Sequence, residues 1–271
     1  MSLPPGATDT HMHFYGPFDR WPLPSTAVIK APEALVPAYR QMQRRLGLQR
    51  VVVVQPSAYR DDNACTMGAV REIGDDARAV VVVDPQASEP ELAALAATGA
   101  VGLRLFMLPG GMYTMAQIPE LAARVAPFGW HLQLQLDGRN LPDHEAMLRP
   151  LASRLVIDHT GKFLVPVPVD HPSFRCLQRL VDLGAHVKLS APYETSKVGA
   201  PGFDDVAVLA RALVRQAPDR MLWATNWPHP GQPPQDEQLF VDWLDSLVPD
   251  TATRDRILVD NPARLYGFGP A

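Results

Sequence analysis

Cysteine is scarce in this sequence, with only Cys65 and Cys176 among 271 residues. The two lie far apart, and neither has a cysteine or histidine at the spacing of a metal site, so we predict two reduced, buried thiols. Long apolar runs are also missing, because segments such as 51–54 and 79–83 are far shorter than the ~20 residues that cross a membrane. The N-terminus lacks a basic segment followed by an apolar one. We therefore expect no signal peptide, no membrane partner and a cytoplasmic location.

A block of charge of either sign is absent as well. The 25 lysines and arginines nearly balance the 29 aspartates and glutamates, and the formal net charge is −4. No basic stripe indicates a nucleic-acid partner. Hydrophobic residues make up 46% of the chain, which is enough to bury one large core, and no linker or repeat divides it. We therefore predict one domain over residues 1–271 and leave open whether it forms a homo-oligomer.

Short apolar runs rich in β-branched residues recur along the chain at the spacing of βα units. The predicted strands are 8–13, 50–55, 79–83, 100–105, 131–136, 155–158, 185–189 and 221–225. Several are continuously apolar, as the four valines 51–54 show, which is typical of parallel strands covered on both faces.

Amphipathic segments between these strands predict helices. The clearest are 34–46, 89–97, 172–183 and 204–216, and the tail segment 251–258 indicates one more. Glycine or proline follows most of them closely, as expected at helix ends. Eight strands with intervening helices favour a closed α/β fold, a single (β/α)₈ TIM barrel, over an open sheet.

Polar residues gather where the predicted strands end, which is where a barrel of this kind places its catalytic groups. The candidates, in chain order, are His11, His13, Gln55, Ser57, Tyr59, Arg104, Gln135, His159, Lys162, Lys188, Tyr193 and Asn226. Random placement of polar residues would not favour this one end of the strands.

The histidines have two kinds of interpretation. His11 and His13 are two residues apart in a strand, so both side chains point to the same face and can bind a metal or contact one substrate oxygen. The alternative is a hydrogen-bonded structural pair. His159 can be a ligand, a general acid or a carbonyl polariser, or else a satisfied histidine near the core.

The cations point to an anionic substrate. Arg104 interrupts an apolar strand, and a buried guanidinium needs an anionic partner, for which a carboxylate is well shaped. A structural salt bridge is the alternative. Lys162 can bind a carboxylate or lie at the surface, and Lys188 gives a weaker signal of the same kind.

Four segments together resemble the amidohydrolase superfamily over essentially the whole chain. They are residues 9–13 with the two histidines, His159, the Trp-Pro-His-Pro run 227–230 and the closing segment 260–268. Segments 55–57 with 62–63, 159–162 and 189–194 are similar to its lactone-processing branch, which includes 2-pyrone-4,6-dicarboxylate lactonases and D-galactarolactone isomerases.

The resemblance implies a metal site made of the two strand-one histidines, histidines after strands five and six, and an aspartate after strand eight that also acts as general base. Here Asn226 stands at the strand-eight position, and strand five carries Gln133 and Gln135 towards its catalytic end. A neutral amide is a poor ligand for a divalent ion and accepts no proton at neutral pH. The lactone branch manages without metal, so we expect no cofactor. Zinc held by His11, His13 and His159 is the alternative.

We therefore predict a metal-independent enzyme that attacks the carbonyl of an anionic sugar-acid lactone, its small-molecule partner. The reaction is either isomerisation between 1,5- and 1,4-rings or hydrolysis. Isomerisation needs less help from a base, because a hydroxyl of the substrate itself attacks. His11, His13 and His159 would surround the carbonyl, and loops 20–30, 107–115 and 163–169 would shape the pocket. The cations Arg104, Lys162 and Lys188 would hold a carboxylate, and Gln55, Ser57, Tyr59, Gln135, Tyr193 and Asn226 would bind hydroxyls. The alternatives are a zinc-dependent hydrolase or decarboxylase, and a non-catalytic protein that binds sugar acids.

Overall fold

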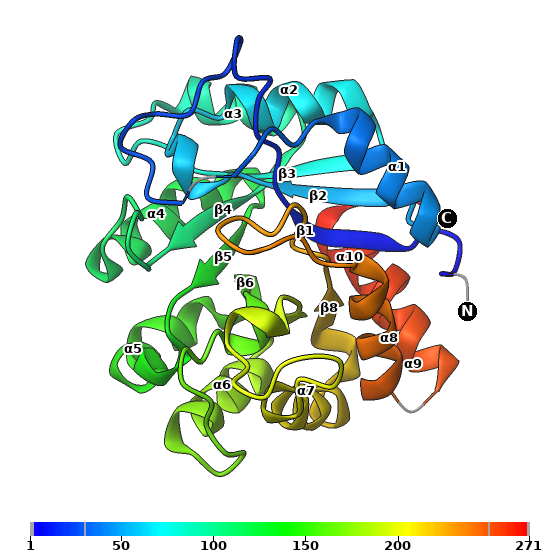
Figure 1. Ribbon diagram of the computed structural model, residues 1–271. Helices are drawn as coiled ribbons and strands as arrows, with labels where there is room; N and C mark the ends of the chain where they lie inside the picture. The colour runs from blue at the N-terminus through cyan, green and yellow to red at the C-terminus, as the bar shows by residue number, and fades with distance from the viewer. Residues whose placement is uncertain (1–2, 30, 249, 270–271) are drawn as a thin grey trace.

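Eight parallel strands, arranged in chain order, form the centre of the molecule (Figure 1). The computed structural model describes residues 3–29, 31–248 and 250–269. The strands are β1 Thr8–Met12, β2 Arg50–Val54, β3 Ala77–Val81, β4 Ala100–Phe106, β5 His131–Gln135, β6 Leu155–Ile157, β7 His186–Leu189 and β8 Met221–Trp223. Each pairs in parallel with the next. The predicted (β/α)₈ barrel is confirmed.

The barrel closes where β1 and β8 end. The backbone N–H of His13 donates to the carbonyl of Trp227 at 2.8 Å, and the N–H of Asn226 donates to the carbonyl of His11 at 2.9 Å. Thr10 adds a side-chain hydrogen bond to the carbonyl of Trp223 at 2.8 Å. Two candidate site residues, His13 and Asn226, therefore stand on the seam that joins the first strand to the last.

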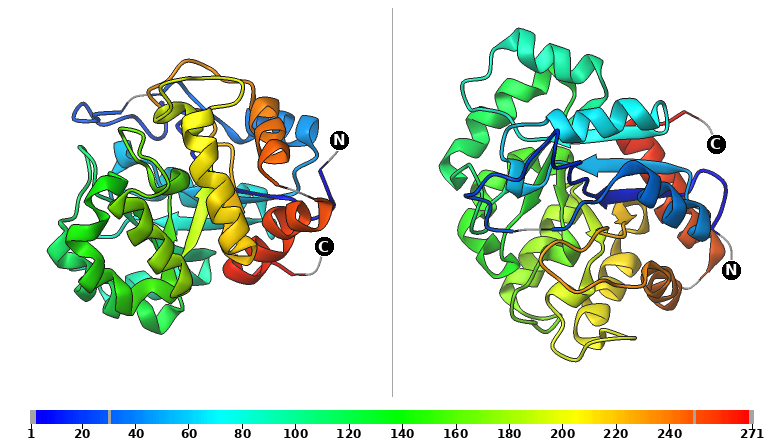
Figure 2. Two further views of the ribbon diagram at one scale, coloured as in Figure 1. Left: turned by 90° about the horizontal axis from the view of Figure 1, so that it is seen from below. Right: turned by 45° about the horizontal axis from the view of Figure 1, so that its top comes forward.

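Helices surround the strands on all sides (Figure 2). They are α1 Val36–Leu46, α2 Ala64–Ile73, α3 Glu89–Ala97, α4 Ile118–Val125, α5 Leu141–Leu148, α6 Pro172–Asp182, α7 Asp204–Gln216, α8 Glu237–Leu247, α9 Thr251–Asp255 and α10 Asn261–Tyr266. The predicted helices are found, but the tail is divided: a π-helical segment, Arg256–Asp260, joins α9 to α10. The predicted ranges do not include α2, α4, α5 or α8. Helices α4 and α5 are short and carry proline in their first turn, so their apolar period is brief.

The continuous valines of β2 show why these strands lack alternation. Val51 and Val53 pack outward against the helices, whereas Val52 and Val54 point into the barrel, and all four are fully buried. Tyr266 belongs to the same inner cluster, so the C-terminal segment helps to fill the barrel.

Strand β3 lies two residues earlier than the predicted range 79–83. Its second residue, Arg78, is charged, and no charged residue lies in the predicted range. The guanidinium of Arg78 donates to the carbonyls of Tyr266 and Gly267 at 3.2 and 2.9 Å, so the charge is satisfied at the strand's edge. Cys65 and Cys176 are both buried and unpaired with each other, as predicted. In the described part of the chain, no helix has the length and apolar character needed to span a bilayer.

Candidate active site

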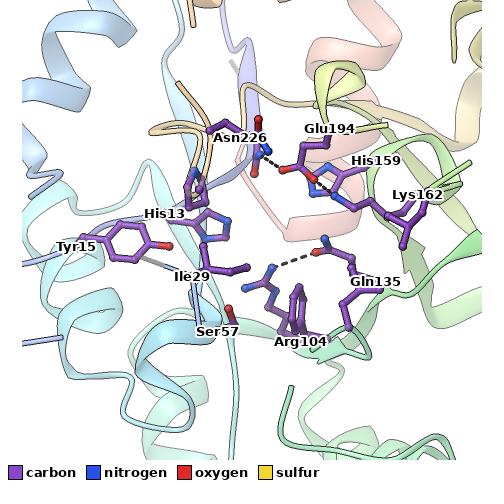
Figure 3. A pocket seen from close by; sticks show the side chains of 16 residues that line it. His13, Tyr15, Ile29, Ser57, Arg104, Gln135, His159, Lys162, Glu194 and Asn226 are labelled. Atoms are coloured by element: carbon purple, nitrogen blue, oxygen red, sulfur yellow. Dashed lines mark hydrogen bonds and ion pairs between the residues drawn. The ribbon is translucent and has the colours of Figure 1, made fainter. Parts of the chain in front are cut away.

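A cavity of about 280 Å³ opens among the carboxyl ends of the strands (Figure 3). Of the predicted site residues, His13, Ser57, Arg104, Gln135, His159, Lys162 and Asn226 line it. Ile29, Leu108 and Leu164 also line it, one from each of the three loops expected to shape the pocket; residue 30, at the end of the first loop, lies outside the described residues. The structure therefore brings together side chains from six strand ends that are far apart in sequence.

The two histidines of the pair lie at different depths in the barrel. His13 reaches the cavity, whereas His11 is fully buried behind it and is not among the lining residues. The Nδ1 atom of His13 lies 2.8 Å from the carbonyl oxygen of Val54, which accepts only, so Nδ1 carries the proton. In neutral His13 the Nε2 atom is then an acceptor, and it lies 3.3 Å from Nε2 of His11. Neutral His11 donates from Nε2 to His13.

That tautomer leaves Nδ1 of His11 as an acceptor in the barrel interior. The Nε2 amide of Gln133 lies 3.3 Å from it and the ammonium of Lys188 lies 3.4 Å from it, and both are donors. Oδ1 of Asp158, which can only accept, lies 3.2 Å from the same atom and is paired with the ammonium of Lys188 at 3.7 Å. Burial, helped by the charge of Lys188, lowers the pKa of His11 well below its usual value. Burial and Arg104 lower the pKa of His13 to about 3, so both rings are neutral at pH 7.

His159 stands beside this pair at the end of β6. Its ring centroid lies 4.8 Å from that of His11, and its Nδ1 atom lies 2.8 Å from the hydroxyl of Ser190. When Ser190 donates this bond, Nε2 of His159 carries a proton and can donate to a ligand. His159 has φ +53°, and Lys162 and Asn226 have φ +50° and +62°. Such left-handed conformations cost about 1 kcal/mol or more and cluster at functional sites.

Arg104 is a buried cation whose two hydrogen-bond partners are neutral. One Nη donates to the carbonyl of Gln55 at 2.6 Å and the other to Oε1 of Gln135 at 3.0 Å. Its side chain is only 4% exposed, and its Nε–H has no hydrogen-bond partner among residues 3–29, 31–248 and 250–269. Among the described residues no carboxylate lies within ion-pair distance of it, so the structural salt bridge that we considered is not formed. Burial lowers the pKa of Arg104, although Asp158 opposes this from further away.

Lys162, unlike Arg104, has a carboxylate partner, because it forms an ion pair with Glu194. The Oε1 atom of Glu194 also accepts a hydrogen bond from Nδ2 of Asn226 at 2.9 Å, and Figure 3 shows these three side chains in a row across the upper wall of the cavity. Burial lowers the pKa of Lys162 to about 8. Glu194 is not among the predicted site residues, although its neighbour Tyr193 is; it lies five residues past β7 in a short 3₁₀ turn, Pro192–Glu194. Its place in the segment 189–194 was the one available signal.

Two predicted substrate-binding residues lie behind the wall on the β2 side. The Nε2 amide of Gln55 donates to the carbonyls of Arg60 and Asp62 at 3.0 and 2.8 Å, so it holds the loop that follows β2. The hydroxyl of Tyr59 donates to the carbonyl of Trp21 at 2.8 Å. Neither lines the cavity.

Two further candidates also lie outside the lining. Lys188 is fully buried below the cavity, where its ammonium donates to the carbonyl of Thr10 at 2.7 Å and to Oε1 of Gln133 at 2.6 Å. The hydroxyl of Tyr193 lies 2.9 Å from Nδ1 of His229, behind Asn226. Lys188 contacts Gln133 and His11, and Tyr193 contacts Asn226, so both lie behind the side chains that line the cavity.

The sequence matches the model of a known family, described as amidohydrolase, over residues 8–268. The chain belongs to the amidohydrolase family. It is 35% identical over 285 aligned positions to a D-galactarolactone isomerase of Agrobacterium fabrum, covering 99% of this chain and 94% of that protein. It is 33% identical to a 4-sulfomuconolactone hydrolase of Hydrogenophaga intermedia, covering 98% of this chain and 90% of the relative. The predicted resemblance to the lactone-processing branch is confirmed.

A solved apo structure from Agrobacterium tumefaciens is similar to this amidohydrolase over the whole fold. Its TM-score is 0.93 at 35% identity, covering 100% of this chain and 98% of that one. With relatives that are a lactone isomerase and a lactone hydrolase, this amidohydrolase is an enzyme of the superfamily.

The distances between the donor atoms in this amidohydrolase suit a divalent metal, but the charges around them do not. His11, Asp158 and His159 offer ligand atoms that all lie within 4.8 Å of one another. The 3.3 Å between Nε2 of His11 and Nε2 of His13 is about the ligand spacing of tetrahedral zinc with bonds of about 2.0–2.1 Å. The ammonium of Lys188, however, lies 3.4 Å from Nδ1 of His11 and 3.7 Å from Asp158. This ammonium repels a metal cation at the same place. The neutral amides at the strand-five and strand-eight positions supply no negative charge to balance it.

Proposed function

We propose that this enzyme attacks the carbonyl carbon of an anionic sugar-acid lactone without a metal, by isomerisation between 1,5- and 1,4-rings. Hydrolysis of the same kind of lactone is the second candidate, favoured by the relative named 4-sulfomuconolactone hydrolase. The more similar relative, D-galactarolactone isomerase, favours isomerisation.

The buried guanidinium of Arg104 is the observation that carries the proposal. Burying a charge without a counter-charge costs several kcal/mol, and its described partners, Gln55 and Gln135, are neutral. A ligand carboxylate in the cavity would supply the missing charge and reach the free N–H groups of the fork. This supports an acid as the substrate.

Donors around the same cavity suit the carbonyl and hydroxyl groups of such a substrate. His159, with its proton on Nε2, and the ammonium of Lys162 can stabilise the negative charge that develops on the carbonyl oxygen. Ser57, Gln135 and Asn226 can bind hydroxyls. The remaining candidates, Gln55, Tyr59, Lys188 and Tyr193, would hold these groups in place from behind, and His11 would orient His13.

The strand-eight amide bears on the choice between the two reactions. Asn226 cannot accept a proton from water, whereas a substrate hydroxyl held near the carbonyl attacks within the molecule and gains effective molarities of about 10⁵ M or more. This supports isomerisation. The position of Lys188 beside His11 supports the absence of a metal.

The test is to incubate chelator-treated enzyme with the 1,5- and 1,4-lactones of aldaric acids in oxygen-18-labelled water and to follow them by NMR and mass spectrometry. Isomerisation gives the other ring without label, whereas hydrolysis gives the open acid with one labelled oxygen. Conversion of no lactone in this set would contradict the proposal. Activity that appears only after zinc is added would contradict its metal-independent part.

A further inference from the structure

The hydrogen bonds around Asn226 fix which way its amide faces. Its Nδ2 atom lies 2.9 Å from Oε1 of Glu194, and a carboxylate oxygen can only accept, so this atom is the nitrogen. The second amide proton goes to the hydroxyl of Tyr193, also at 2.9 Å. That hydroxyl in turn lies 2.9 Å from Nδ1 of His229, to which it can donate. Both protons of the amide are therefore used within the protein.

This arrangement leaves the Oδ1 atom of Asn226 to the cavity. Asn226 lines the cavity, and no group in residues 3–29, 31–248 or 250–269 donates to Oδ1. An amide oxygen can accept a hydrogen bond from a hydroxyl and so orient it, but it cannot remove the proton. A base has to stand next to it.

Glu194 meets that requirement. It is the one carboxylate among the described residues that line the cavity, and its Oε1 atom touches the amide of Asn226. The other oxygen faces the ammonium of Lys162, which stabilises the ionised form. Asp158, the carboxylate beside His11, is fully buried and does not line the cavity. His13 is less suited as the base, because its Nδ1 donates to the carbonyl of Val54 and its Nε2 accepts from His11.

We propose that Glu194 is the catalytic proton-transfer residue of this enzyme and that Asn226 positions the attacking hydroxyl for it. The inference rests on the proposed lactone isomerisation. Oδ1 of Asn226 first accepts a hydrogen bond from the substrate hydroxyl and holds it near Glu194. The hydroxyl then turns its proton to the carboxylate of Glu194, loses it there and forms a C–O bond to the lactone carbonyl carbon. The tetrahedral intermediate then breaks its bond to the original ring oxygen, which takes the proton back from Glu194. No proton is gained or lost overall.

The test compares Glu194→Gln with a matched control, Glu145→Gln. Glu145 pairs with Arg179 outside the cavity, and its side chain is 18% exposed, close to the 14% of Glu194. General acid–base catalysis contributes about 10²–10⁴-fold, so we expect Glu194→Gln to lower kcat by at least about 10²-fold and to change KM by less than about threefold. Glu145→Gln should match the wild type. Binding of an open aldarate, measured by calorimetry, and thermal melting should show that both variants are folded.

A second variant separates proton transfer from simple charge balance. Glu194→Gly leaves room for a small acid, so formate should restore activity in proportion to its concentration. A Glu194→Gln enzyme with kcat within about threefold of the wild type would overturn the inference, as would a folded Glu194→Gly enzyme that formate does not rescue. Failure of the proposed function appears in the wild-type arm instead: if the wild type converts no lactone, both proposals fall.

Discussion

Arg104 donates to Oε1 of Gln135 at 3.0 Å, so a buried cation is paired with a neutral amide at the floor of the cavity. We expect Arg104→Gln to reduce kcat/KM for the anionic lactone by about 10²-fold, because hydrogen bonds to charged groups contribute about 1.5–3 kcal/mol. Steady-state kinetics should show the loss mainly in KM. The control is Arg154→Gln, since Arg154 also donates only to neutral carbonyls, those of Trp130 and Ala122, outside the cavity. Equal losses in both variants would contradict a substrate-binding role.

Metal dependence can be tested on the same enzyme. Because the ammonium of Lys188 already stands beside His11, we expect that exhaustive chelation leaves kcat unchanged and that purified protein holds far less than one equivalent of zinc. Metal analysis alongside the lactone assay checks both statements. Activity that follows the zinc content from sample to sample would refute this prediction.

Lys188 also predicts a stability effect. Its ammonium and Asp158 are both fully buried, 3.7 Å apart. Removing one partner of a buried pair is expected to cost about 3–5 kcal/mol, so Lys188→Met should lower the free energy of unfolding by about that amount in urea denaturation. The double variant Lys188→Met with Asp158→Asn should recover part of the loss. No recovery would mean that the two charges are not coupled.

His131 predicts how stability changes with pH. It is buried in the barrel at 4% exposure, and burial, followed by the charge of Lys188, lowers its pKa to about 3. The unfolded chain, with a histidine pKa near 6.5, therefore takes up a proton between the two values, and stability falls as pH decreases through that range. At about pH 5.5 the loss relative to pH 7.5 is about 1.4 kcal/mol for this one histidine. His131→Phe should make the urea midpoint less dependent on pH, and an unchanged dependence would contradict this assignment.

Asn226→Asp tests the choice between the two reactions. The variant puts a carboxylate on strand eight, where it can activate water, and places it beside Glu194. We expect the labelled open acid to increase at least about tenfold relative to the other ring. Repulsion between the two carboxylates should raise the pKa of one of them and shift the acidic limb of the kcat profile to higher pH. A product ratio equal to that of the wild type would show that the strand-eight amide does not decide the outcome.

The sequence predicts which strand ends form the site, because strand order and direction follow from the alternation of apolar runs and helices. The sequence does not predict how deep in the barrel interior each of these side chains lies. Gln133 and Gln135 point to the same side of β5, yet only Gln135 lines the cavity, and Gln133 lies one layer lower with Lys188. His11 and His13 are divided in the same way. The layers of a barrel interior depend on strand tilt and register, which a single sequence does not contain.

Loop residues are the other part that sequence reasoning misses. Glu194 reaches the cavity only because the chain turns back after β7 through Ala191, which has φ +47°. An alanine gives no signal for a left-handed conformation, since glycine or asparagine usually occupies it. The ion pair with Lys162 depends on that turn.

The backbone hydrogen bonds that close the barrel between β1 and β8 also hold candidate site residues in place, so activity should depend on the closure of the barrel. The same short stretches of backbone that join the first strand to the last, at His13–Trp227 and Asn226–His11, also carry the groups that would meet the substrate. We expect heating to open this junction before most helices unfold, which separates His13 from Asn226. Activity in this enzyme should therefore be lost at a lower temperature than helical circular dichroism, and a bound substrate analogue that bridges the two sides should bring the two transitions together.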